Sequence, residues 1–480
     1  MTRACFAAAL GLLLAAVPLY AGSAWQPAPA EGSASGRQTA DQQGGGESAG
    51  APAASPQSCA TALPGNPRAS VYEPPPPQAA RHRPAGHAKR DEEPKGHRAL
   101  SGDPTPTLQT DTAFCTEQAA ARYRQIAAQG GWPTLPRPFG PGAAKDPQKI
   151  HLLRQRLAAE GDLDEAAPED IWDDALTAAL MRFQERAGIA PSGQADKETL
   201  DAMNVPADVR ARQLEQSAKR IRELLGRASI LADRPYLAVN IPSASVEAVE
   251  NFRAVQRHAA VAGRPDDPSP QISTLIRGIT INPSWTIPRA IIEREVIPRL
   301  RRDPGYLRRA HLVVLDGRGH RVSLRRALRA HGESFIIRQE PGAKNALGRL
   351  RIDMPNTKQV YMHDTPERRL FADNYRFLSH GCVRVDGIYD LATWLLNDGH
   401  SSGRWNRQAI EDAVARRAQK KIKLPHPLPV AWVYLDAWEN ADGVIHFAPD
   451  VYDLDGAAQK QEATSPPQDR APASKAAAGP

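Results

Sequence analysis

This chain has few long apolar runs, and it lacks the sequence patterns of membrane-spanning and metal-binding proteins. Beyond its first residues no segment is long and apolar enough to span a bilayer. No Cys/His spacing typical of a metal site occurs, so the sequence predicts neither a metal nor an organic cofactor. The formal net charge of +7 over 480 residues does not by itself indicate nucleic-acid binding, and it would also suit an acidic polymer. We therefore predict no nucleic-acid partner.

Residues 1–24 have the pattern of a signal peptide. Arg3 supplies a positive charge, residues 6–17 form a short apolar stretch, and small residues follow at 21–24. We predict cleavage after this segment and an exported protein of the periplasm or cell envelope. An uncleaved N-terminal anchor is the alternative.

Three cysteines would remain after cleavage: Cys59, Cys115 and Cys382. An exported chain meets oxidising conditions, in which disulfides form. Cys59 and Cys115 could pair and leave Cys382 free, or both could stay free, because spacing alone does not fix a pairing.

Two segments are too poor in large apolar residues to form a core. Residues 25–108 are rich in Ala, Pro, Gly, Ser and Gln, and they predict a disordered tether. Such a tether could leave the folded part in transient proximity to a membrane. Residues 456–480 predict a disordered tail.

Helical patterns fill the chain between the tether and residue 234. They predict a helical scaffold segment, a compact three-helix unit and a basic helical connector, at residues 109–145, 146–206 and 207–234. In the three-helix unit Asp146 can cap the first helix with Pro147 at its first position. Gly161 and Gly188 are expected to end the first two helices.

From residue 235 the pattern changes to short strands separated by Pro, Asn and Gly. Their spacing predicts a β-sandwich or small barrel over residues 235–455. Residues 289–337 interrupt it with a helical, Arg-rich insertion, much of which must be a solvated helix face. The predicted fold class is therefore α+β and multidomain, with a mostly-β domain that carries a helical insertion, plus a three-helix domain.

The chemistry is predicted from Cys382, which follows Ser379-His380-Gly381, and from His363, 19 residues upstream. Cysteine attacks as the thiolate, and an imidazole can take the thiol proton. Gly381 lets the backbone approach a substrate carbonyl. Asp386 is predicted to cap a helix that starts just after the cysteine, whose N-terminal dipole would favour the thiolate.

The string Ser379-His380-Gly381-Cys382-Val383-Arg384, preceded by His363, resembles the nucleophile motif of L,D-transpeptidases, the peptidoglycan cross-linking enzymes of the bacterial envelope. The strings at 282–288, 338–342 and 345–348 resemble the larger class of this family, which carries an inserted lid. Met354 departs from the Phe that is common there. The pattern from Phe183-Gln184 to Asn204 resembles a peptidoglycan-binding domain of the three-helix type.

The resemblance implies that Cys382 attacks the third residue of a donor tetrapeptide stem and expels the terminal D-alanine. His363 would accept the thiol proton and later act as acid and base. The backbone N–H groups near Gly381 would hold the oxyanion. The amine of a second stem would then attack the thioester, which makes a 3→3 cross-link. Carbapenems are expected covalent inhibitors.

The remaining site candidates are predicted to bind or frame the substrate. Arg384 would contact a substrate carboxylate or the loop around Cys382, or would form a structural ion pair. Ser379 and His380 would support His363 or shape the groove. The candidates for groove walls are Tyr361, Trp285, Asn345 and Gly348.

Three other functions remain open at this point. With water as acceptor the same residues would make an L,D-carboxypeptidase. With a lysine of an envelope protein as acceptor, they would anchor that protein to peptidoglycan. A non-enzymatic wall-binding scaffold is the alternative of another class, against which the Cys382/His363 pair argues.

Overall fold

The computed structural model describes residues 100, 102–137, 139, 146–164, 170–227, 234–329, 335–400 and 403–456. The predicted signal peptide, nearly all of the predicted tether and the predicted tail lie outside these residues. None of the helices among them is long and apolar enough to cross a membrane.

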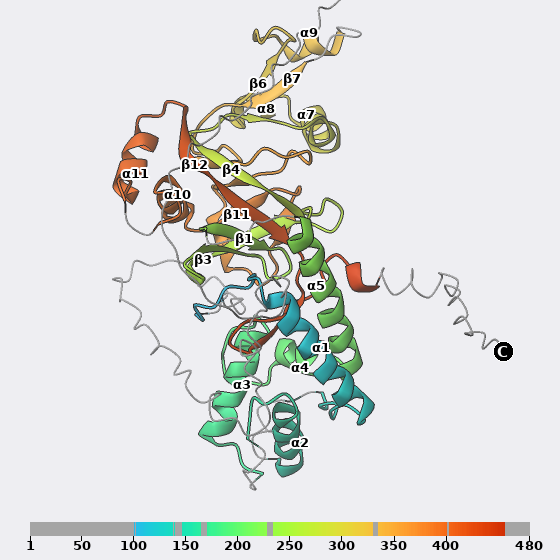
Figure 1. The fold of residues 1–480 in the computed structure, drawn as a ribbon. Coiled ribbons are helices and arrows are strands. Elements are labelled where there is room, and N and C mark those ends of the chain that lie inside the picture. The colour runs from blue at the N-terminus through green and yellow to red at the C-terminus, as the bar shows by residue number, and fades with distance from the viewer. Residues whose placement is uncertain are drawn as a thin grey trace, which may run out of the picture. The chain divides into compact units, whose positions relative to one another are not determined.

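Helices dominate the first part of the described chain (Figure 1). They are α1 (Thr112–Ala128), α2 (Pro147–Ala158), α3 (Asp174–Arg186), α4 (Lys197–Met203) and α5 (Ala207–Arg227). The three predicted helices of the compact unit are α2, α3 and α4. Asp146, Asp173 and Asp196 cap them, because each carboxylate accepts hydrogen bonds from the first-turn N–H groups.

The three-helix unit has a core of its own. Its helices contribute the buried side chains Ile150, Leu153, Leu157, Leu176, Leu180, Phe183 and Leu200. Gln184 is fully buried beside them, and its amide donates hydrogen bonds to Thr199 Oγ1 and to the Gln194 carbonyl. It also accepts one from the Gly193 N–H. The Phe-Gln pair therefore fixes both the core and the turn before α4.

The second part is a mixed sheet that closes on itself. Its strands are β1 (Tyr236–Asn240), β2 (Ser245–Glu250), β3 (Arg253–Gly263), β4 (Ile272–Ile281), β8 (Leu350–Asp353), β9 (Met362–His363), β10 (Phe377–Ser379), β11 (Val383–Val385) and β12 (Lys420–Val433). Within the described residues the order is β10-β3-β11-β9-β8-β4-β12-β1-β2, and β2 also pairs with β3. This last pairing closes the strands from β3 to β2 into a ring, with β10 paired to β3 outside it. The small barrel is therefore the one of the two predicted architectures that is present.

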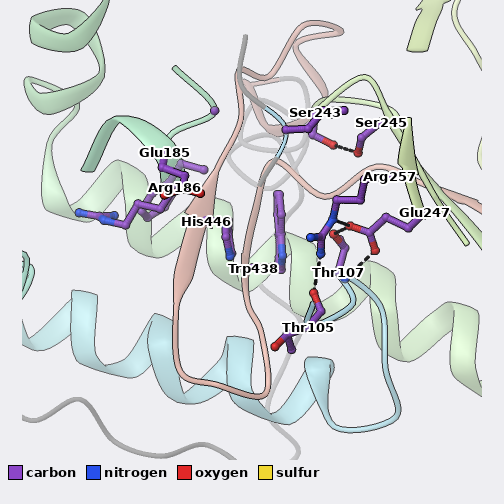
Figure 2. A pocket seen from close by; sticks show the side chains of 13 residues that line it. Thr105, Thr107, Glu185, Arg186, Ser243, Ser245, Glu247, Arg257, Trp438 and His446 are labelled. Atoms are coloured by element: carbon purple, nitrogen blue, oxygen red, sulfur yellow. Dashed lines mark hydrogen bonds and ion pairs between the residues drawn. The ribbon is translucent and has the colours of Figure 1, made fainter. Parts of the chain in front are cut away.

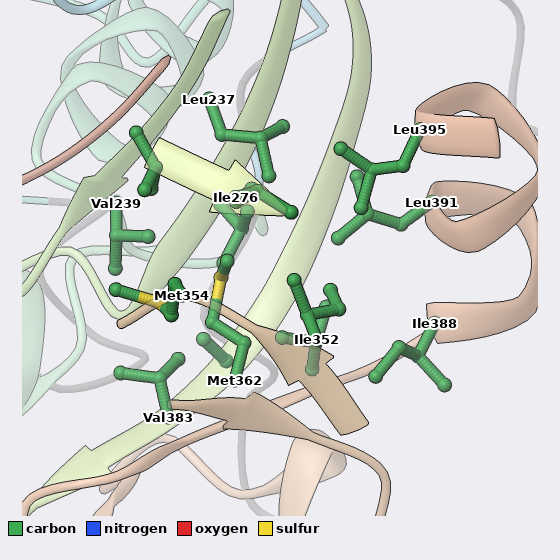
Figure 3. Close-up of a cluster of buried hydrophobic side chains, with 14 of the residues drawn as sticks. Leu237, Val239, Ile276, Ile352, Met354, Met362, Val383, Ile388, Leu391 and Leu395 are labelled. Carbon is green, nitrogen blue, oxygen red and sulfur yellow. The ribbon is translucent and has the colours of Figure 1, made fainter. Parts of the chain in front are cut away.

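Apolar side chains fill the core of this part, and α10 (Ile388–Leu396) helps to form it. Figure 3 shows Ile388, Leu391 and Leu395 of α10 pointing toward buried strand residues such as Ile352. Helix α11 (Arg407–Ala415) lies next to α10. The sheet and α10 thus bury a common core, which makes the strand positions rigid.

The insertion between β4 and β8 is only partly helical. It contains β5 (Trp285–Thr286), α6 (Arg289–Ile291), a π-helical turn (Ile292–Val296), α7 (Ile297–Arg302), α8 (Tyr306–Arg309), β6 (Leu312–Leu315), α9 (Leu324–Arg329) and β7 (Ile336–Gln339). The prediction of a helical lid missed the three-stranded sheet β5-β7-β6. The run Leu312–Leu315 forms a strand because its apolar side chains cover a separate core with Ile292, Val296 and Ile337.

The segment after the cysteine also differs from its prediction. Val383–Val385 is strand β11, and α10 begins only at Ile388. The N-cap of α10 is Gly387, with φ +58°, and no side chain caps it. Asp386 accepts a hydrogen bond from the Gly387 N–H, 2.9 Å away, and does not cap the helix. The predicted helix through Ile388, Leu391 and Leu395 is therefore present as α10, whereas the prediction of Asp386 as its cap is wrong.

The chain ends its described part in the hairpin of β13 (Ala437–Glu439) and β14 (Ile445–Phe447). Its Phe447 ring lies 5.7 Å from the Tyr123 ring of α1. Helix α5 is tied to the segment before the hairpin, because Asp436 accepts hydrogen bonds from Gln213 and Ser217.

Candidate active site

Strand pairing brings the predicted nucleophile and base to neighbouring positions. Strands β9 and β11 are parallel and in register, with Val383 opposite Met362 and Arg384 opposite His363. Val383 and Met362 are fully buried in the core. Because side chains alternate along a strand, Cys382 and His363 lie on the opposite, outward face.

The His363 ring is oriented by the backbone of the next residue. Its Nδ1–H donates a hydrogen bond to the Asp364 carbonyl, 2.6 Å away, which leaves Nε2 as the acceptor. Burial lowers the pKa of His363 to about 3, and the positive charges of Arg384 and Arg351 act in the same direction. The imidazole is therefore neutral at pH 7, as a general base must be.

Cys382 is the free cysteine among the described residues, and it is half-buried. Burial raises the pKa of its thiol to about 11, whereas hydrogen bonds with the backbone and side chain of Tyr361 act to lower it. The Cys382 thiol is therefore protonated at neutral pH, and it would need a base to act as the predicted nucleophile. Cys115 is disulfide-bonded. Its predicted partner Cys59 lies outside the described residues.

Gly381 and Ser379 shape the backbone that carries the thiol. Gly381 has φ +100°, and a Cβ on it would lie 3.3 Å from the Pro268 carbonyl oxygen. The hydroxyl of Ser269 donates to the Gly381 carbonyl at 2.9 Å. The Ser379 hydroxyl donates to the Cys382 carbonyl and accepts from the Gly381 N–H at 3.2 Å. These hydrogen bonds fix the turn that presents Cys382.

The two charged residues that flank the cysteine already have partners within the protein. Arg384 pairs with Glu367 at 2.8 Å. Nε2 of His380 lies 2.5 Å from Glu295, which belongs to the π-helical turn of the insertion. Arg384 thus makes the ion pair that was one of its predicted roles, and His380 connects the nucleophile loop to the insertion. Their predicted contacts with substrate stay predictions.

Tyr361 and Trp285 extend the same surface. The Tyr361 ring centre lies 5.8 Å from that of His363, and the Arg351 guanidinium lies 5.4 Å from the centre of the Tyr361 ring. Burial raises the pKa of the Tyr361 hydroxyl, and Cys382 and Trp285 lie close enough to influence it. Trp285 of the insertion therefore lies near the loop that carries Cys382, a link that the sequence did not indicate.

Asn345 and Gly348 lie in the loop before β8. Asn345 is buried, and its amide donates to the Glu340 carbonyl at 3.0 Å and accepts from the Leu347 N–H at 2.8 Å. Gly348 has φ +61° and faces the carboxylate of Asp364. Both residues hold this loop in shape, and their predicted role as groove walls remains untested.

Asp364 is a site residue that the sequence analysis missed. It is buried, its carboxylate accepts from the Arg349 N–H at 2.8 Å, and Arg368 pairs with it at 3.1 Å. Its carbonyl is the acceptor for His363. The signal in the sequence was its position directly after His363. That position does not reveal that the backbone carbonyl of Asp364, and not its carboxylate, accepts the hydrogen bond from His363.

A pocket elsewhere in the structure has a different lining (Figure 2). It includes neither Cys382 nor His363, and it contains the ion pair of Arg257 with Glu247 at 2.9 Å. The rings of Trp438 and His446 stack there at 5.0 Å. The predicted catalytic pair therefore lies on β9 and beside β11, away from this pocket.

Two family models match different parts of this chain. Residues 234–408 match the L,D-transpeptidase catalytic domain, and residues 146–203 match the putative peptidoglycan binding domain. The chain thus combines a catalytic domain of cell-wall enzymes with a wall-binding module. Its residues 234–408 carry the L,D-transpeptidase catalytic domain.

The relatives are distant or partial. A putative L,D-transpeptidase of Haemophilus influenzae is 27% identical over 220 residues, which cover 45% of this chain and 44% of that protein. This chain therefore matches less than half the length of that relative.

The similar solved structures include an L,D-transpeptidase from Mycobacterium smegmatis, with 12% identity, a TM-score of 0.19, and 42% of this chain and 58% of that chain covered. Another comes from Stackebrandtia nassauensis, with 13% identity, a TM-score of 0.23, and coverage of 60% and 91%. A third is LdtMt1 in complex with imipenem, with 15% identity, a TM-score of 0.19, and coverage of 42% and 59%. These TM-scores are too low to support an argument about the site.

Proposed function

We propose that this protein forms 3→3 cross-links between peptidoglycan stems through a thioester on Cys382. The observation that carries the proposal is the register of β9 and β11, which puts Cys382 and His363 on one outward face. The hydrogen bond from His363 Nδ1 to the Asp364 carbonyl leaves Nε2 for the proton of the thiol.

In the first half-reaction the Cys382 thiol adds to the carbonyl of the third residue of a donor stem. Its proton passes to His363 Nε2 as the C–S bond forms, because the resting groups are a neutral thiol and a neutral imidazole. Collapse of the tetrahedral intermediate breaks the C–N bond, and His363 returns the proton to the leaving D-alanine.

The oxyanion would be held by the N–H of Cys382. Among the described residues this N–H donates no hydrogen bond, whereas the N–H of Gly381 donates to the Ser379 hydroxyl. A preorganised donor of this kind stabilises the charge that develops on the carbonyl oxygen.

In the second half-reaction an amine of another stem attacks the thioester. His363 takes the proton of the amine, the C–S bond breaks, and the thiol is restored with that proton. No redox step or outside co-reactant enters the balance. The three-helix domain would keep the enzyme on the polymer, and the site of action would be the cell envelope.

Mass spectrometry of the chain without residues 1–24, mixed with a disaccharide-tetrapeptide, tests the proposal. A cross-linked dimer that has lost one D-alanine is expected from the wild type, and none from Cys382→Ala or His363→Ala. Tripeptide alone would make the protein an L,D-carboxypeptidase. Unchanged substrate with retained wall binding would leave the scaffold function.

Incubation with a carbapenem gives an independent readout of the nucleophile. One covalent adduct on the tryptic peptide that contains Cys382 is expected, and none in Cys382→Ser. An adduct on another residue would contradict the assignment of the nucleophile.

A further inference from the structure

The positive charge of this chain is concentrated in the insertion between β4 and β8. Residues 289–337 contain twelve arginines, no lysine and five acidic residues. Of the 61 basic and 54 acidic residues in the chain, 49 of each lie outside this segment, so the insertion alone accounts for the formal net charge of +7. A surface that serves only solubility mixes both signs of charge. The segregation of charge therefore indicates a partner of opposite sign.

A second group of cations lies where α11 ends and β12 begins. Residues 416–423 contain no acidic residue, and five of the eight are basic: Arg416, Arg417, Lys420, Lys421 and Lys423. We call these five residues the β12 cluster, and all of their side chains are exposed. Without this cluster and the insertion, the chain has 44 basic and 49 acidic residues. The two segments are thus strongly positive on a chain that is otherwise slightly negative.

The two groups of cations belong to the same end of the barrel. Asn282, the first residue after β4, donates hydrogen bonds from its amide to the carbonyls of Val414 at 3.0 Å and Ala418 at 3.3 Å. Lys420 is the register partner of Ile281, the last residue of β4. Figure 1 shows α8 and α9 of the insertion beyond this end of β4 and β12. Both groups can therefore approach one extended surface.

The arginines of the insertion are only partly neutralised by neighbours. Six exposed ones form no ion pair with any residue in the described ranges: Arg301, Arg302, Arg308, Arg318, Arg325 and Arg326. We call these six the insertion arginines. The β12 cluster likewise has no ion pair within the part of the chain that the structure describes. Next to the nucleophile, in contrast, Arg384 pairs with Glu367 at 2.8 Å.

The arrangement of these cations fits an extended anionic surface and not a small ligand. They come from α7, α8, α9, the turn after β6 and the β12 cluster, and none of them lines the pocket in Figure 2. A bilayer presents phosphate groups in a plane, where separated cations can contact them at the same time. Guanidinium groups suit this partner, because they bind phosphate through two parallel hydrogen bonds.

One exposed apolar side chain lies among the cations. Ile336 of β7 is 40% exposed and is the register partner of Leu315, the last residue of β6. The turn that carries Arg318 follows Leu315 directly. An apolar side chain beside basic ones is typical of surfaces that bind at the boundary between headgroups and acyl chains.

We propose that the insertion arginines and the β12 cluster together dock on a membrane whose surface contains anionic phospholipid. The bilayer is favoured over the wall polymer because a different part of the chain, residues 146–203, matches a peptidoglycan binding domain. The predicted signal peptide also brings the chain to a membrane during export. Glu295 of the insertion lies 2.5 Å from His380, so docking holds the loop of Cys382 near the membrane. The inference does not rest on the proposed function.

Vesicle binding tests the proposal. The protein is residues 25–480, the predicted mature chain, so that the apolar residues 6–17 cannot insert. Sedimentation with vesicles of equal parts phosphatidylcholine and phosphatidylglycerol gives the partition coefficient. We expect it to exceed that for pure phosphatidylcholine by at least about 100-fold, because each basic residue at an anionic surface contributes about fivefold. In about 1 M NaCl, where the Debye length is about 3 Å, the difference should vanish.

Two triple variants test the two groups of cations separately: Arg301→Gln/Arg302→Gln/Arg308→Gln and Lys420→Gln/Lys421→Gln/Lys423→Gln. Each should lower the partition coefficient for the anionic vesicles by about 10- to 100-fold. Replacement of the same three arginines by lysine keeps the charge and should keep the binding. Loss of binding in this lysine variant as well would overturn the electrostatic role. Urea midpoints equal to that of the wild type confirm that the variants are folded.

The matched control removes the same charge elsewhere: Lys219→Gln/Arg253→Gln/Lys358→Gln. These side chains are exposed, form no ion pair with a residue in the described ranges and belong to neither group. The control should bind the anionic vesicles as the wild type does. An equal loss in the control would reduce the effect to net charge and overturn the proposal.

Three further results would also overturn it. The wild type would bind both kinds of vesicle equally, or only one of the two triple variants would lose binding. In the third case, binding to isolated peptidoglycan would fall by the same factor as binding to vesicles, which would make the polymer the partner of these cations. The outcome is separate from catalysis, since a protein that forms no cross-link but shows the expected vesicle binding would lose the proposed function and keep the docking surface.

Discussion

Gly348 lies directly against the carboxylate of Asp364, although the two residues belong to different segments. A Cβ on residue 348 would sit 2.4 Å from the carboxylate carbon. Asp364 in turn supplies the carbonyl that orients His363. The glycine before β8 therefore allows the close packing that sets the direction of His363, the proposed base.

Gly348→Ala should destabilise the protein and slow acylation. The φ of +61° alone costs an alanine about 1–2 kcal/mol, and overpacking against Asp364 adds about 1–3 kcal/mol. Gly319→Ala is the matched control, since Gly319 has φ +83° but no atom within 4 Å of the position that the new methyl group would take. Urea denaturation and the carbapenem acylation rate measure both effects. Equal losses in the two variants would show that the contact with Asp364 contributes nothing.

Asp364→Ala should lower kcat by about 10- to 100-fold with little change in KM, because a base displaced by a fraction of an ångström loses its geometry. The carboxylate fixes the loop through the Arg349 N–H, 2.8 Å away. Asp364→Asn keeps an acceptor oxygen there and should restore most of the rate. A raised KM with unchanged kcat, or no rescue by Asn, would contradict the positioning role.

Local patterns predicted a large part of this structure. The caps at Asp146, the alternating strands from residue 235 and the motif around Cys382 each depend on neighbours in the chain. The insertion was harder, because the four apolar residues Leu312–Leu315 lie between Arg-rich helices and become a strand only by pairing with β7.

Features that depend on register could not be predicted. The sequence places His363 and Cys382 19 residues apart, and nothing local states that β9 and β11 pair in parallel. The same limit applies to Arg351, which reaches the site because β8 pairs with β9. Glu295 was hidden in an arginine-rich run, and only the folded insertion brings it to His380.

The rate of acylation by a carbapenem should stay nearly constant from about pH 5 to about pH 9. Burial lowers the pKa of His363 to about 3 and raises that of Cys382 to about 11, so neither group titrates between these limits in the free protein. Stopped-flow absorbance across this range measures the rate. A bell-shaped profile centred near neutrality would instead indicate a thiolate–imidazolium pair.

Stability should fall as the pH drops below neutrality. His363 has its ordinary pKa of 6.5 in the unfolded chain and about 3 in the folded protein, so the unfolded chain binds the proton first. The stabilising contribution is therefore complete above pH 6.5 and is lost as the pH falls toward 3. Urea midpoints at about pH 7.5 and pH 5 should differ less for His363→Gln than for the wild type. An equal difference in both proteins would exclude this histidine as a source of the loss.

Glu295→Gln should loosen the insertion over the nucleophile loop. The carboxylate of Glu295 lies 2.5 Å from His380 of the nucleophile loop and 3.5 Å from Arg264, which follows β3. Loss of its charge therefore weakens both contacts. We expect faster hydrogen exchange in residues 289–302 and acylation slowed about threefold to tenfold, in the range of a partly buried charged hydrogen bond.

Glu293→Gln is the control for that variant, because Glu293 pairs with Arg289, whose side chain is 91% exposed. An exposed pair of this kind contributes little, so both exchange and acylation should stay at wild-type values. If exchange accelerates equally in the two variants, the negative charge of the helical segment in general, and not the contact of Glu295 with His380, holds the insertion in place. Acylation that stays unchanged in Glu295→Gln while exchange accelerates would separate the position of the insertion from the reactivity of Cys382.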